Sequence, residues 1–443
     1  MKDMTVFRAS ESCGGRLVNC PRDLPLTGGV IDSREARPGV MFCALPGERA
    51  DGHDYIKAAF ERGAACCLAR YLPEGVAGPA ILVDDVAAAM ARIARECRDR
   101  LSIPVVGITG SSGKTTAKEM CAAVLSQRYN TLKTEKNFNN ELGVPLTLFR
   151  IGPEHGAAVV ELGINHFGEM SRLGAMARPD IAIFTLIGRS HLEALGDLDG
   201  VLRAKGELIE HMAPDALVIV NGDDEKLAAW EPGRRKLTYG LGEGCDVRGV
   251  NLRAQGAEGS ALTVQAGARR FELHLPAYGR HLAYAALAAA ALGLELGLSE
   301  EEIARGAASY VPVGRRANLV RTDCLTIIDD CYNANPDSVK MAIESARDLG
   351  GRLVCVLGDM LELGPDSERL HREVGEAARG AGALLLTVGE RSEAMGGRHF
   401  AGKAELIAAL PGILRRGDRV LVKASHSMAF EEISEALRAL QLD

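Results

Sequence analysis

The stretch VVGITGSSGKTT, from Val105 to Thr116, decides the fold of this chain. The β-branched residues at its start predict a buried parallel strand, and two glycines, Gly110 and Gly113, predict a tight turn before a helix. Glycine lets backbone N–H groups approach phosphate oxygens closely, and the start of a helix adds partial positive charge. Strand, turn and helix together predict a P-loop-type nucleotide triphosphate site in a parallel α/β sheet.

Each residue type in this loop suits phosphate binding. Lys114 would bring a full positive charge to the β- and γ-phosphates, and the Thr115 hydroxyl would bind Mg²⁺. The loop departs from the common pattern at Ile108, where a glycine is usual. A strand–turn–helix without a ligand is the alternative, but a lysine directly after the glycines has no packing purpose. We therefore expect the nucleotide to contact Gly110, Ser111, Ser112, Gly113, Lys114, Thr115 and Thr116.

Size and composition restrict the class of protein. With 443 residues the chain should contain about two to four domains. Its 47% hydrophobic and 25% charged residues are ordinary for a globular protein. The net charge of −7, without a basic run, argues against a nucleic-acid partner.

The sequence predicts a cytoplasmic protein that is not inserted in a membrane. The segment MKDMTVFRAS has no apolar run of the kind that a signal peptide contains. The longest apolar stretch, Leu282–Leu294, is mostly alanine and fits a buried helix better than a membrane span. Eleven scattered cysteines without a CxxC pair indicate reduced thiols and no zinc site.

The order of strand-like and helix-like segments predicts an α/β protein of three domains. Residues 1–84 form a small α/β domain without a nucleotide-binding glycine pattern, and residues 85–313 form the central P-loop-type, parallel-sheet domain. Residues 314–443 alternate strands and helices, as a Rossmann-like doubly wound sheet does. That last part lacks GxGxxG after its first strand, so a dinucleotide cofactor is not expected.

Polar residues follow the predicted strands of the central domain. Glu161 ends the strand that starts at Ala157, and His191 lies just beyond the strand Ile181–Leu186. Ligands bind at the carboxyl ends of parallel strands, so both residues should lie near Lys114. Taken singly, each has a bland alternative as a helix cap or a surface group. Lys205, on a predicted helix, is by its spacing alone an ordinary surface lysine.

Two further segments carry polar residues that fit an ordinary polar turn equally well. They are the loop NFNNELGVP, from Asn137 to Pro145, and the stretch from Ile31 to Asp54. Polar residues also follow two predicted strands of the last domain, in the exits DDCYNANPDS and GDMLELG. The exits suggest a second functional edge at Asp330, Asn333, Asn335 and Asp359.

Seven motifs in one order give the chain a resemblance. TGSSGKTT, NFNNELGVP, VVELGINHFGEM, SHLEALG, RAKGEL, DDCYNANPDS and VLGDMLELG together resemble the Mur ligase family of peptidoglycan synthesis. The resemblance runs from about Asp32 to the end of the chain. IDSREARPG with GERADGHD resembles the family's UDP-binding amino-terminal domain. DDCYNANPDS and GDMLELG indicate the branch that adds a dipeptide.

The resemblance implies an ADP-forming acid–amino acid ligase. ATP would phosphorylate the terminal carboxylate of UDP-N-acetylmuramoyl-tripeptide, and the amine of D-alanyl-D-alanine would attack the acyl phosphate. This reaction belongs to peptidoglycan precursor synthesis in the cytoplasm, and so to cell-wall biogenesis, cell shape and cell division. Either diaminopimelate or lysine fits the third residue of the tripeptide. The expected oligomeric state is a monomer.

The resemblance also implies cofactors and roles for individual residues. ATP and two Mg²⁺ ions are expected, with Thr115, Glu161, His191 and a carbamate on Lys205 as metal ligands. The catalytic set is then Lys114, Glu161, His191 and Lys205. The carbamate would turn a repulsive ammonium into an anionic oxygen ligand.

Matching positions implied by the same resemblance bind the remaining substrate groups. ATP would be reached from the last domain, which closes over it and the dipeptide, by Arg315 and Asp330. The other substrate-binding positions are Ser33, Arg34, Asn139, Asn140, Asn333 and Asn335. Family members usually carry GRHNxxNA, whereas this chain has GRHLAYAA, with Leu282 and Ala285 at the asparagine positions. A side-chain hydrogen bond to adenine is therefore not expected from them.

Two alternative functions compete with this interpretation. Another Mur ligase or a folylpolyglutamate synthase is the nearer one, but the latter usually shows TGTNGKGS and lacks the DSR…DGH segment. A P-loop switch or transport ATPase, which is not a ligase, is the other. It predicts no role for Lys205 and no turnover that depends on a UDP substrate.

Overall fold

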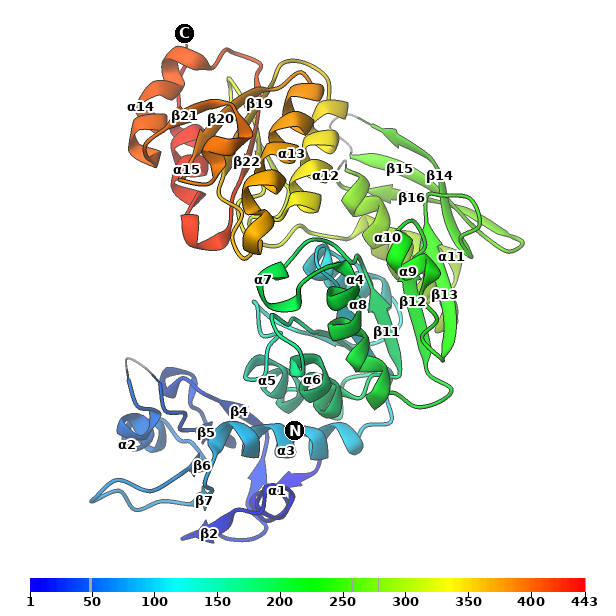
Figure 1. Ribbon diagram of the computed structural model, residues 1–443. Coiled ribbons are helices and arrows are strands. Elements are labelled where there is room, and N and C mark those ends of the chain that lie inside the picture. The colour runs from blue at the N-terminus through cyan, green and yellow to red at the C-terminus, as the bar shows by residue number, and fades with distance from the viewer. Residues whose placement is uncertain (48–49, 256–258, 278, 443) are drawn as a thin grey trace.

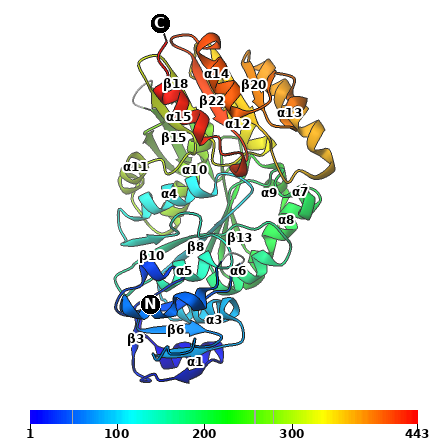
Figure 2. The same cartoon turned by 90° about the vertical axis from the view of Figure 1, so that its left-hand side faces the viewer.

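The computed structural model describes residues 1–47, 50–255, 259–277 and 279–442. Three lobes follow one another along the molecule, in chain order from bottom to top of Figure 1. The view turned by 90° shows the same stacking, with the amino-terminal lobe at the opposite end from the carboxy-terminal lobe (Figure 2). None of the helices in the described ranges is long and apolar enough to cross a membrane.

The amino-terminal lobe is built on a five-stranded sheet in the order β2-β7-β6-β5-β4. Strands β4 to β7 are parallel and β2 is antiparallel to β7. A small antiparallel pair, β1 and β3, lies beside it. The elements are β1 (Met4–Thr5), α1 (Val6–Cys13), β2 (Arg16–Val18), β3 (Pro25–Leu26), β4 (Gly28–Val30), β5 (Val40–Cys43), α2 (Ile56–Glu61), β6 (Cys66–Ala69) and β7 (Ala80–Leu82). Residues 48 and 49 of the GERADGHD motif lie outside the described residues.

A nine-stranded sheet forms the middle lobe, in the order β16-β15-β14-β13-β12-β11-β8-β10-β9. The P-loop strand β8 pairs in parallel with β10 and β11. Strands β14, β15 and β16 extend the sheet with antiparallel pairing. Its strands are β8 (Val105–Thr109), β9 (Thr131–Lys133), β10 (Ala157–Glu161), β11 (Ile181–Phe184), β12 (Leu217–Asn221), β13 (Arg235–Gly240), β14 (Val247–Ala254), β15 (Ser260–Ala266) and β16 (Arg269–Leu275).

The helices of this lobe are α3 (Val86–Asp99), α4 (Lys114–Leu125), α5 (Gly143–Phe149), α6 (Glu169–Ala177), α7 (Leu192–Leu195), α8 (Leu198–Gly206), α9 (Glu225–Ala229), α10 (Arg280–Glu295) and α11 (Glu300–Ala308). The alanine-rich stretch forms α10, which is buried along most of its length and packs against α4. Small side chains allow this close packing, and the expectation of a buried helix is confirmed.

A six-stranded sheet in the order β17-β18-β22-β19-β20-β21 organises the carboxy-terminal lobe. Two separate hydrophobic clusters show that helices cover both of its faces, as in a doubly wound sheet. The elements are β17 (Asn318–Arg321), β18 (Thr326–Asp329), α12 (Pro336–Asp348), β19 (Leu353–Gly358), α13 (Ser367–Gly380), β20 (Leu384–Val388), β21 (Arg398–Phe400), α14 (Lys403–Ile413), β22 (Arg419–Lys423) and α15 (Glu431–Ala439).

Two edge strands of this lobe are absent from the sequence prediction. Strand β17 is antiparallel to β18, and β21 is a short parallel strand next to β20. Both are only three or four residues long and carry exposed positions, so their hydrophobic alternation is weak. The three-domain α/β fold itself is confirmed.

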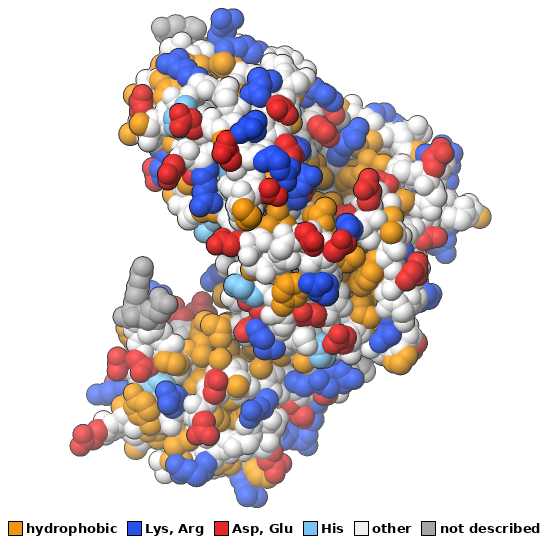
Figure 3. Space-filling view, viewed as in Figure 1, with side chains coloured by type: hydrophobic (Ala, Val, Ile, Leu, Met, Phe, Trp, Pro, Cys, Tyr) orange, Lys and Arg blue, Asp and Glu red, His pale blue; other side chains and the backbone are white. Residues whose placement is uncertain are grey.

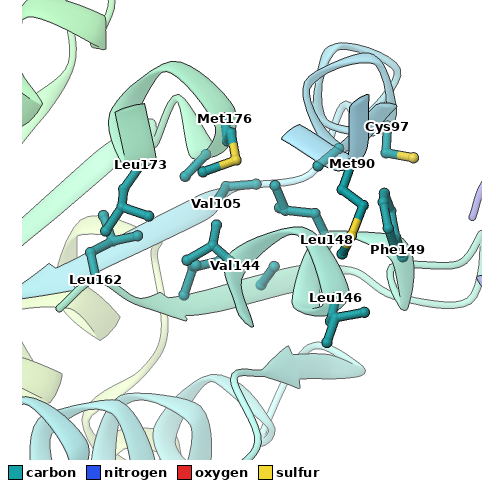
Figure 4. Close-up of a cluster of buried hydrophobic side chains, with 14 of the residues drawn as sticks. Met90, Cys97, Val105, Val144, Leu146, Leu148, Phe149, Leu162, Leu173 and Met176 are labelled. Carbon is teal, nitrogen blue, oxygen red and sulfur yellow. The ribbon is translucent and has the colours of Figure 1, made fainter. Parts of the chain in front are cut away.

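One hydrophobic core joins the amino-terminal and middle lobes. Met90 and Cys97 of α3 meet Leu148 and Phe149 of α5 in a cluster that continues to Met176 of α6 (Figure 4). The same cluster reaches Met41 of β5 and Leu68 of β6 in the lower sheet. Apolar burial thus fixes the lower lobe to the P-loop lobe.

Candidate active site

A large pocket lies between the P-loop lobe and the carboxy-terminal lobe. Its volume is about 910 Å³, which suits a nucleotide with part of a second substrate. The space-filling view shows the molecule hollowed on the side where the lower lobe faces the upper two (Figure 3). Residues predicted for the site that line the pocket are Ser111, Ser112, Gly113, Lys114, Thr116, Asn139, Asn140, Glu161, His191, Asp330, Asn333 and Asn335.

The P-loop is a tight turn closed on itself. Gly110 and Gly113 have φ of 146° and 80°, which side chains rarely adopt, and a Cβ on Gly110 would lie 2.0 Å from Thr185 Oγ1. The Lys114 Nζ donates to the Gly110 carbonyl at 2.7 Å. Burial lowers the pKa of Lys114, and the nearby Glu161 carboxylate opposes that shift. The loop thus places the Lys114 side chain beside the backbone amides that would bind phosphate oxygens.

Glu161 ends β10 and is held from several sides. Its Oε2 accepts a hydrogen bond from the Thr115 hydroxyl at 3.0 Å, and its Oε1 accepts from the Asn139 amide at 2.8 Å. Lys118 lies one turn along α4, with its Nζ 3.8 Å from Oε2. The carboxylate is buried, so these partners compensate the loss of water. Thr115 and Gly110 do not line the pocket themselves, and Thr115 reaches it through Glu161.

His191 and Lys205 meet behind the P-loop lysine. Lys205, on α8, is only 1% exposed, and no hydrogen bond or ion pair joins its ammonium to any described residue. Burial lowers the pKa of Lys205 well below the usual lysine value, and Lys114 lowers it further. Burial also lowers the pKa of His191, and the cations Lys205 and Lys114 add to that shift. Lys114, His191 and Lys205 therefore lie near enough to influence one another's charge, although Lys205 does not line the pocket.

The oxygen donors beside the P-loop suit Mg²⁺ bound together with a nucleotide. No three His, Cys, Asp or Glu side chains in the described ranges converge as a ready metal site. Mg²⁺ in nucleotide sites commonly uses only one or two carboxylates and takes its other oxygens from phosphates and water. The Thr115 hydroxyl and the Glu161 carboxylate, in hydrogen-bond contact beside the P-loop, fit that requirement. Lys205 fits only if a carbamate replaces its positive charge.

The carboxy-terminal lobe supplies the opposite wall. Asp330 accepts hydrogen bonds from Lys423 Nζ at 2.6 Å and from the Ala317 amide at 3.0 Å. Lys423 also donates to the Asn333 carbonyl, at 2.9 Å. Asn335 caps α12 through the Ser338 amide. Lys423 thus fixes the loop that carries the polar exits of β18.

The two adjacent arginines before β17 have different surroundings. Arg315 pairs with Asp329 and Glu435 and does not line the pocket. Arg316 lines it, and its guanidinium lies over the Tyr332 ring, 3.8 Å from the centroid. The role predicted for Arg315 stays a prediction, and Arg316 is an additional candidate. The pair of adjacent arginines in SYVPVGRRANLV was the sequence feature that could have indicated Arg316.

Sequence reasoning also missed His281, Tyr332 and Lys423 as lining residues. His281 opens α10, and burial lowers its pKa while Asp330 opposes the shift. The next residue, Leu282, and Ala285 lie in the hydrophobic core beneath, so they offer adenine no polar contact. The GRH segment was the signal for His281.

The residues predicted in the amino-terminal lobe lie outside this pocket. Ser33 is buried in a short 3₁₀ turn, and Arg34 is exposed and forms an ion pair with Asp32 at 2.7 Å.

Two predicted residues of the middle lobe, Asn140 and Ser111, also hold the backbone near the pocket. Asn140 caps the start of α5 by accepting from the Gly143 amide at 2.9 Å. Ser111 donates to the Gly188 carbonyl at 2.9 Å, which ties the P-loop to the segment before His191.

Comparison with known proteins gives three family models that match successive segments. They are the Mur ligase family catalytic domain (residues 26–98), the Mur ligase middle domain (108–293) and the Mur ligase glutamate ligase domain (315–426).

Curated relatives and solved structures align over almost the whole chain. The UDP-N-acetylmuramoyl-tripeptide–D-alanyl-D-alanine ligase of Escherichia coli is 37% identical over 99% of both chains, and that of Bacillus subtilis is 36% identical over 98% of both. A crystal structure of MurF from Acinetobacter baumannii is 30% identical with a TM-score of 0.90, covering 98% of this chain and 99% of that one. MurF ligase from Thermotoga maritima in complex with ADP is 29% identical with a TM-score of 0.85, covering 95% and 99%.

Proposed function

The chain belongs to the Mur ligase family, and we propose that it joins D-alanyl-D-alanine to the terminal carboxylate of a UDP-N-acetylmuramoyl-tripeptide. It is an ATP-dependent ligase that forms ADP and phosphate. Relatives with that activity in their names are 31–37% identical to it over nearly their full length. The observation in the site that supports the proposal is that Lys114 and His191 line one pocket between two lobes, with the buried Lys205 near enough to lower the pKa of His191.

The chemical difficulty is the approach of a carboxylate to a triphosphate, since both are anions. Lys114 and the amides at the start of α4 stabilise the negative charge that builds on the transferred phosphoryl group. Two Mg²⁺ ions, when bound, would neutralise the remaining phosphate charge. Thr115 and Glu161 would hold one ion, and His191 with a modified Lys205 would hold the other. Glu161 is oriented for this by Asn139 and Lys118.

The environment of Lys205 favours its carbamylation. Its depressed pKa raises the fraction of neutral amine at a given pH, and only the neutral amine attacks CO₂. A bond forms between Nζ and the carbon, a proton leaves, and the side chain gains one negative charge. That charge would lie near the Lys114 cation and the His191 ring, in place of an ammonium for which the described residues provide no ion pair.

The three lobes divide the substrates in this proposal. Residues 1–84 would hold the UDP end, with Ser33 and Arg34 as contacts, and residues 85–313 would hold ATP. Residues 314–443 would close on ATP and the dipeptide through Arg315, Asp330, Asn333 and Asn335. Asn139 and Asn140 would contact the muramoyl peptide from the pocket wall. We further propose that the enzyme acts as a monomer in the cytoplasm.

Phosphate release measured with purified substrates tests the proposal. ATP is supplied with UDP-N-acetylmuramoyl-tripeptides carrying diaminopimelate or lysine, each with and without D-alanyl-D-alanine. We expect release that requires both the tripeptide and the dipeptide, and loss of release in Lys114→Ala. Release that ignores both peptides would instead identify a P-loop ATPase that is not a ligase.

A further inference from the structure

The segment Gly188–Glu193, which carries His191, is held by acidic residues of the other lobe. The Arg189 amide donates to Asp337 Oδ2 at 2.7 Å, and the Arg189 guanidinium lies 3.3 Å from Glu373. A Cβ on Gly188 would come within 2.7 Å of Asp337 Oδ2, so a side chain there would displace this carboxylate. We call residues 188–193 with Asp337, Glu362 and Glu373 the interlobe clasp.

Glu362 makes the contact of the clasp that touches the site. Its carboxylate lies 2.5 Å from His191 Nδ1, and its backbone carbonyl accepts from the Glu193 amide at 3.3 Å. Leu192, between these two residues, packs against the hydrophobic cores of both lobes. His191 and Glu362 both adopt positive φ, 54° and 61°, which is uncommon for residues other than glycine. Both residues thus adopt an uncommon backbone conformation at the point where they contact each other.

The contact determines which ring nitrogen of His191 is available. Hydrogen bonding to a carboxylate places the ring proton on Nδ1 and leaves the lone pair on Nε2. Histidines that bind metals commonly show this arrangement, in which the other nitrogen donates to a carboxylate that fixes the ring. His191 lines the pocket, whereas Glu362 does not. Glu362 therefore acts on the pocket only through His191.

We propose that Glu362 is a positioning residue that orients His191 when the carboxy-terminal lobe docks. His191, the expected metal ligand, then has the correct orientation only when the carboxy-terminal lobe is docked. Docking of the lobe that carries the substrate wall and completion of the site become one event. This inference rests on the proposed function, in which His191 faces a divalent cation.

Hydrogen exchange of the protein without ligands tests the mechanical half. Peptides covering residues 186–196 contain the Arg189 and Glu193 amides, whose acceptors belong to the other lobe. Glu362→Ala should accelerate exchange in these peptides, and Glu362→Gln, which retains an acceptor oxygen, should do so less. Glu368→Gln is the matched control, because Glu368 is an exposed glutamate of the same lobe that pairs with Arg372. Equal exchange in all variants would overturn the proposal.

The positioning half needs a metal readout without turnover. Calorimetry with β,γ-methylene-ATP measures the Mg²⁺ concentration required for half-maximal binding. Glu362→Ala should raise that concentration about 10- to 100-fold, the usual effect of losing a carboxylate behind a metal-binding histidine. Glu362→Gln should lie between, and Glu368→Gln should match the parent protein.

Two outcomes separate the possible failures. Faster exchange with an unchanged Mg²⁺ requirement would reduce Glu362 to a purely structural tie between lobes and overturn the positioning role. A parent protein that binds no nucleotide, or that releases phosphate without the peptides, would refute the proposed function. The proposal on Glu362 fails separately, when the parent protein binds Mg²⁺ with nucleotide and the alanine variant does so equally well.

Discussion

The two junctions between lobes are held by different kinds of contact, apolar at the lower junction and mostly polar at the upper. At the lower junction, α3 and α5 share one continuous apolar core with the amino-terminal sheet. At the upper junction, a polar pocket and the interlobe clasp separate the P-loop from α12 and the loops after β18 and β19. Leu192 is the apolar side chain that contacts the cores on both sides of it.

The difference indicates which junction can open. Exposing apolar surface costs about 25 cal/mol per Å², so separating the lower junction would resemble partial unfolding. Ion pairs and hydrogen bonds at a half-exposed surface are replaced by water at small net cost. Substrates must enter the pocket at the upper junction, and that junction is the one whose opening is inexpensive. Substitutions at four positions test this contrast.

Removing an aromatic ring from the lower junction should have the largest effect. Phe149→Ala leaves a cavity in the shared core, and we expect the free energy of unfolding to fall by about 3–5 kcal/mol. Urea denaturation measures the change. Phe167→Ala is the control, because that ring is exposed and touches Arg203. A loss below about 1 kcal/mol for Phe149→Ala would mean that the lower junction is not held by its core.

Replacing Lys205 should separate stability from activity at the upper junction. Lys205→Met is expected to lower dipeptide-dependent turnover by about 10²–10³-fold, since a charged group of the site is lost. The same change should stabilise the fold, because it removes a buried ammonium without a partner. Thermal unfolding and phosphate release measure both, with the exposed Lys57→Met as control.

The pH dependence of that stabilisation has a definite sign. The pKa of Lys205 is lower in the folded than in the unfolded protein, so the ammonium destabilises the fold fully below the folded pKa. The penalty disappears as pH rises above the unfolded value. The gain from Lys205→Met should therefore shrink with rising pH in CO₂-free buffer. Lys205→Ala should regain part of its turnover with a short carboxylic acid, and full turnover without that acid would exclude the carbamate.

Adding a methyl group to the lower junction should cost less than removing the ring. A Cβ on Gly29 of β4 would lie 2.5 Å from the Phe149 ring, which is itself buried and cannot retreat freely. Gly29→Ala should reduce the free energy of unfolding by about 1–3 kcal/mol. The matched change is Gly28→Ala at the neighbouring position of β4, where a Cβ would meet only Val40 at an ordinary 3.8 Å. Equal losses in the two variants would show that the loss of glycine from β4, not the contact with Phe149, is responsible.

The smallest effect on global stability is expected from the clasp. Arg189→Gln removes ion pairs whose partners are about one-third exposed, and the free energy of unfolding should change by about 0–1 kcal/mol. Exchange in residues 186–196 should nevertheless accelerate, and salt should accelerate it in the parent protein as well. Exchange in residues 143–149 of α5 should not respond to salt, since that helix is held by apolar contacts.

The sequence predicted what depends on local order along the chain. Strand, glycine turn and Lys114 are contiguous, and the position of Glu161 and His191 follows from the rule that parallel strands end at one edge. The surroundings of Lys205 could not be predicted in the same way, because its burial depends on how α8 packs. From spacing alone it was an ordinary surface residue, and only the family resemblance singled it out.

Contacts between distant segments lay beyond sequence reasoning. His191 and Glu362 are 171 positions apart, and nothing in either motif states that one carboxylate faces one imidazole. Arg315 and Arg316 are neighbours in an irregular, bent segment, yet Arg315 pairs with Asp329 while Arg316 lies over Tyr332. The choice between them requires the tertiary structure. The division into three lobes needed only the alternation of strands and helices.

The alanine-rich α10 has a consequence for how mutations accumulate in this enzyme. It packs against α4, the helix that begins at Lys114, and Gly306 of α11 approaches the Val124 backbone of the same helix so closely that a Cβ would lie 2.4 Å away. A larger side chain on either surface would push α4 away from that surface and shift the phosphate loop at its start. Mutations in residues that do not contact a substrate would then change the affinity for the nucleotide.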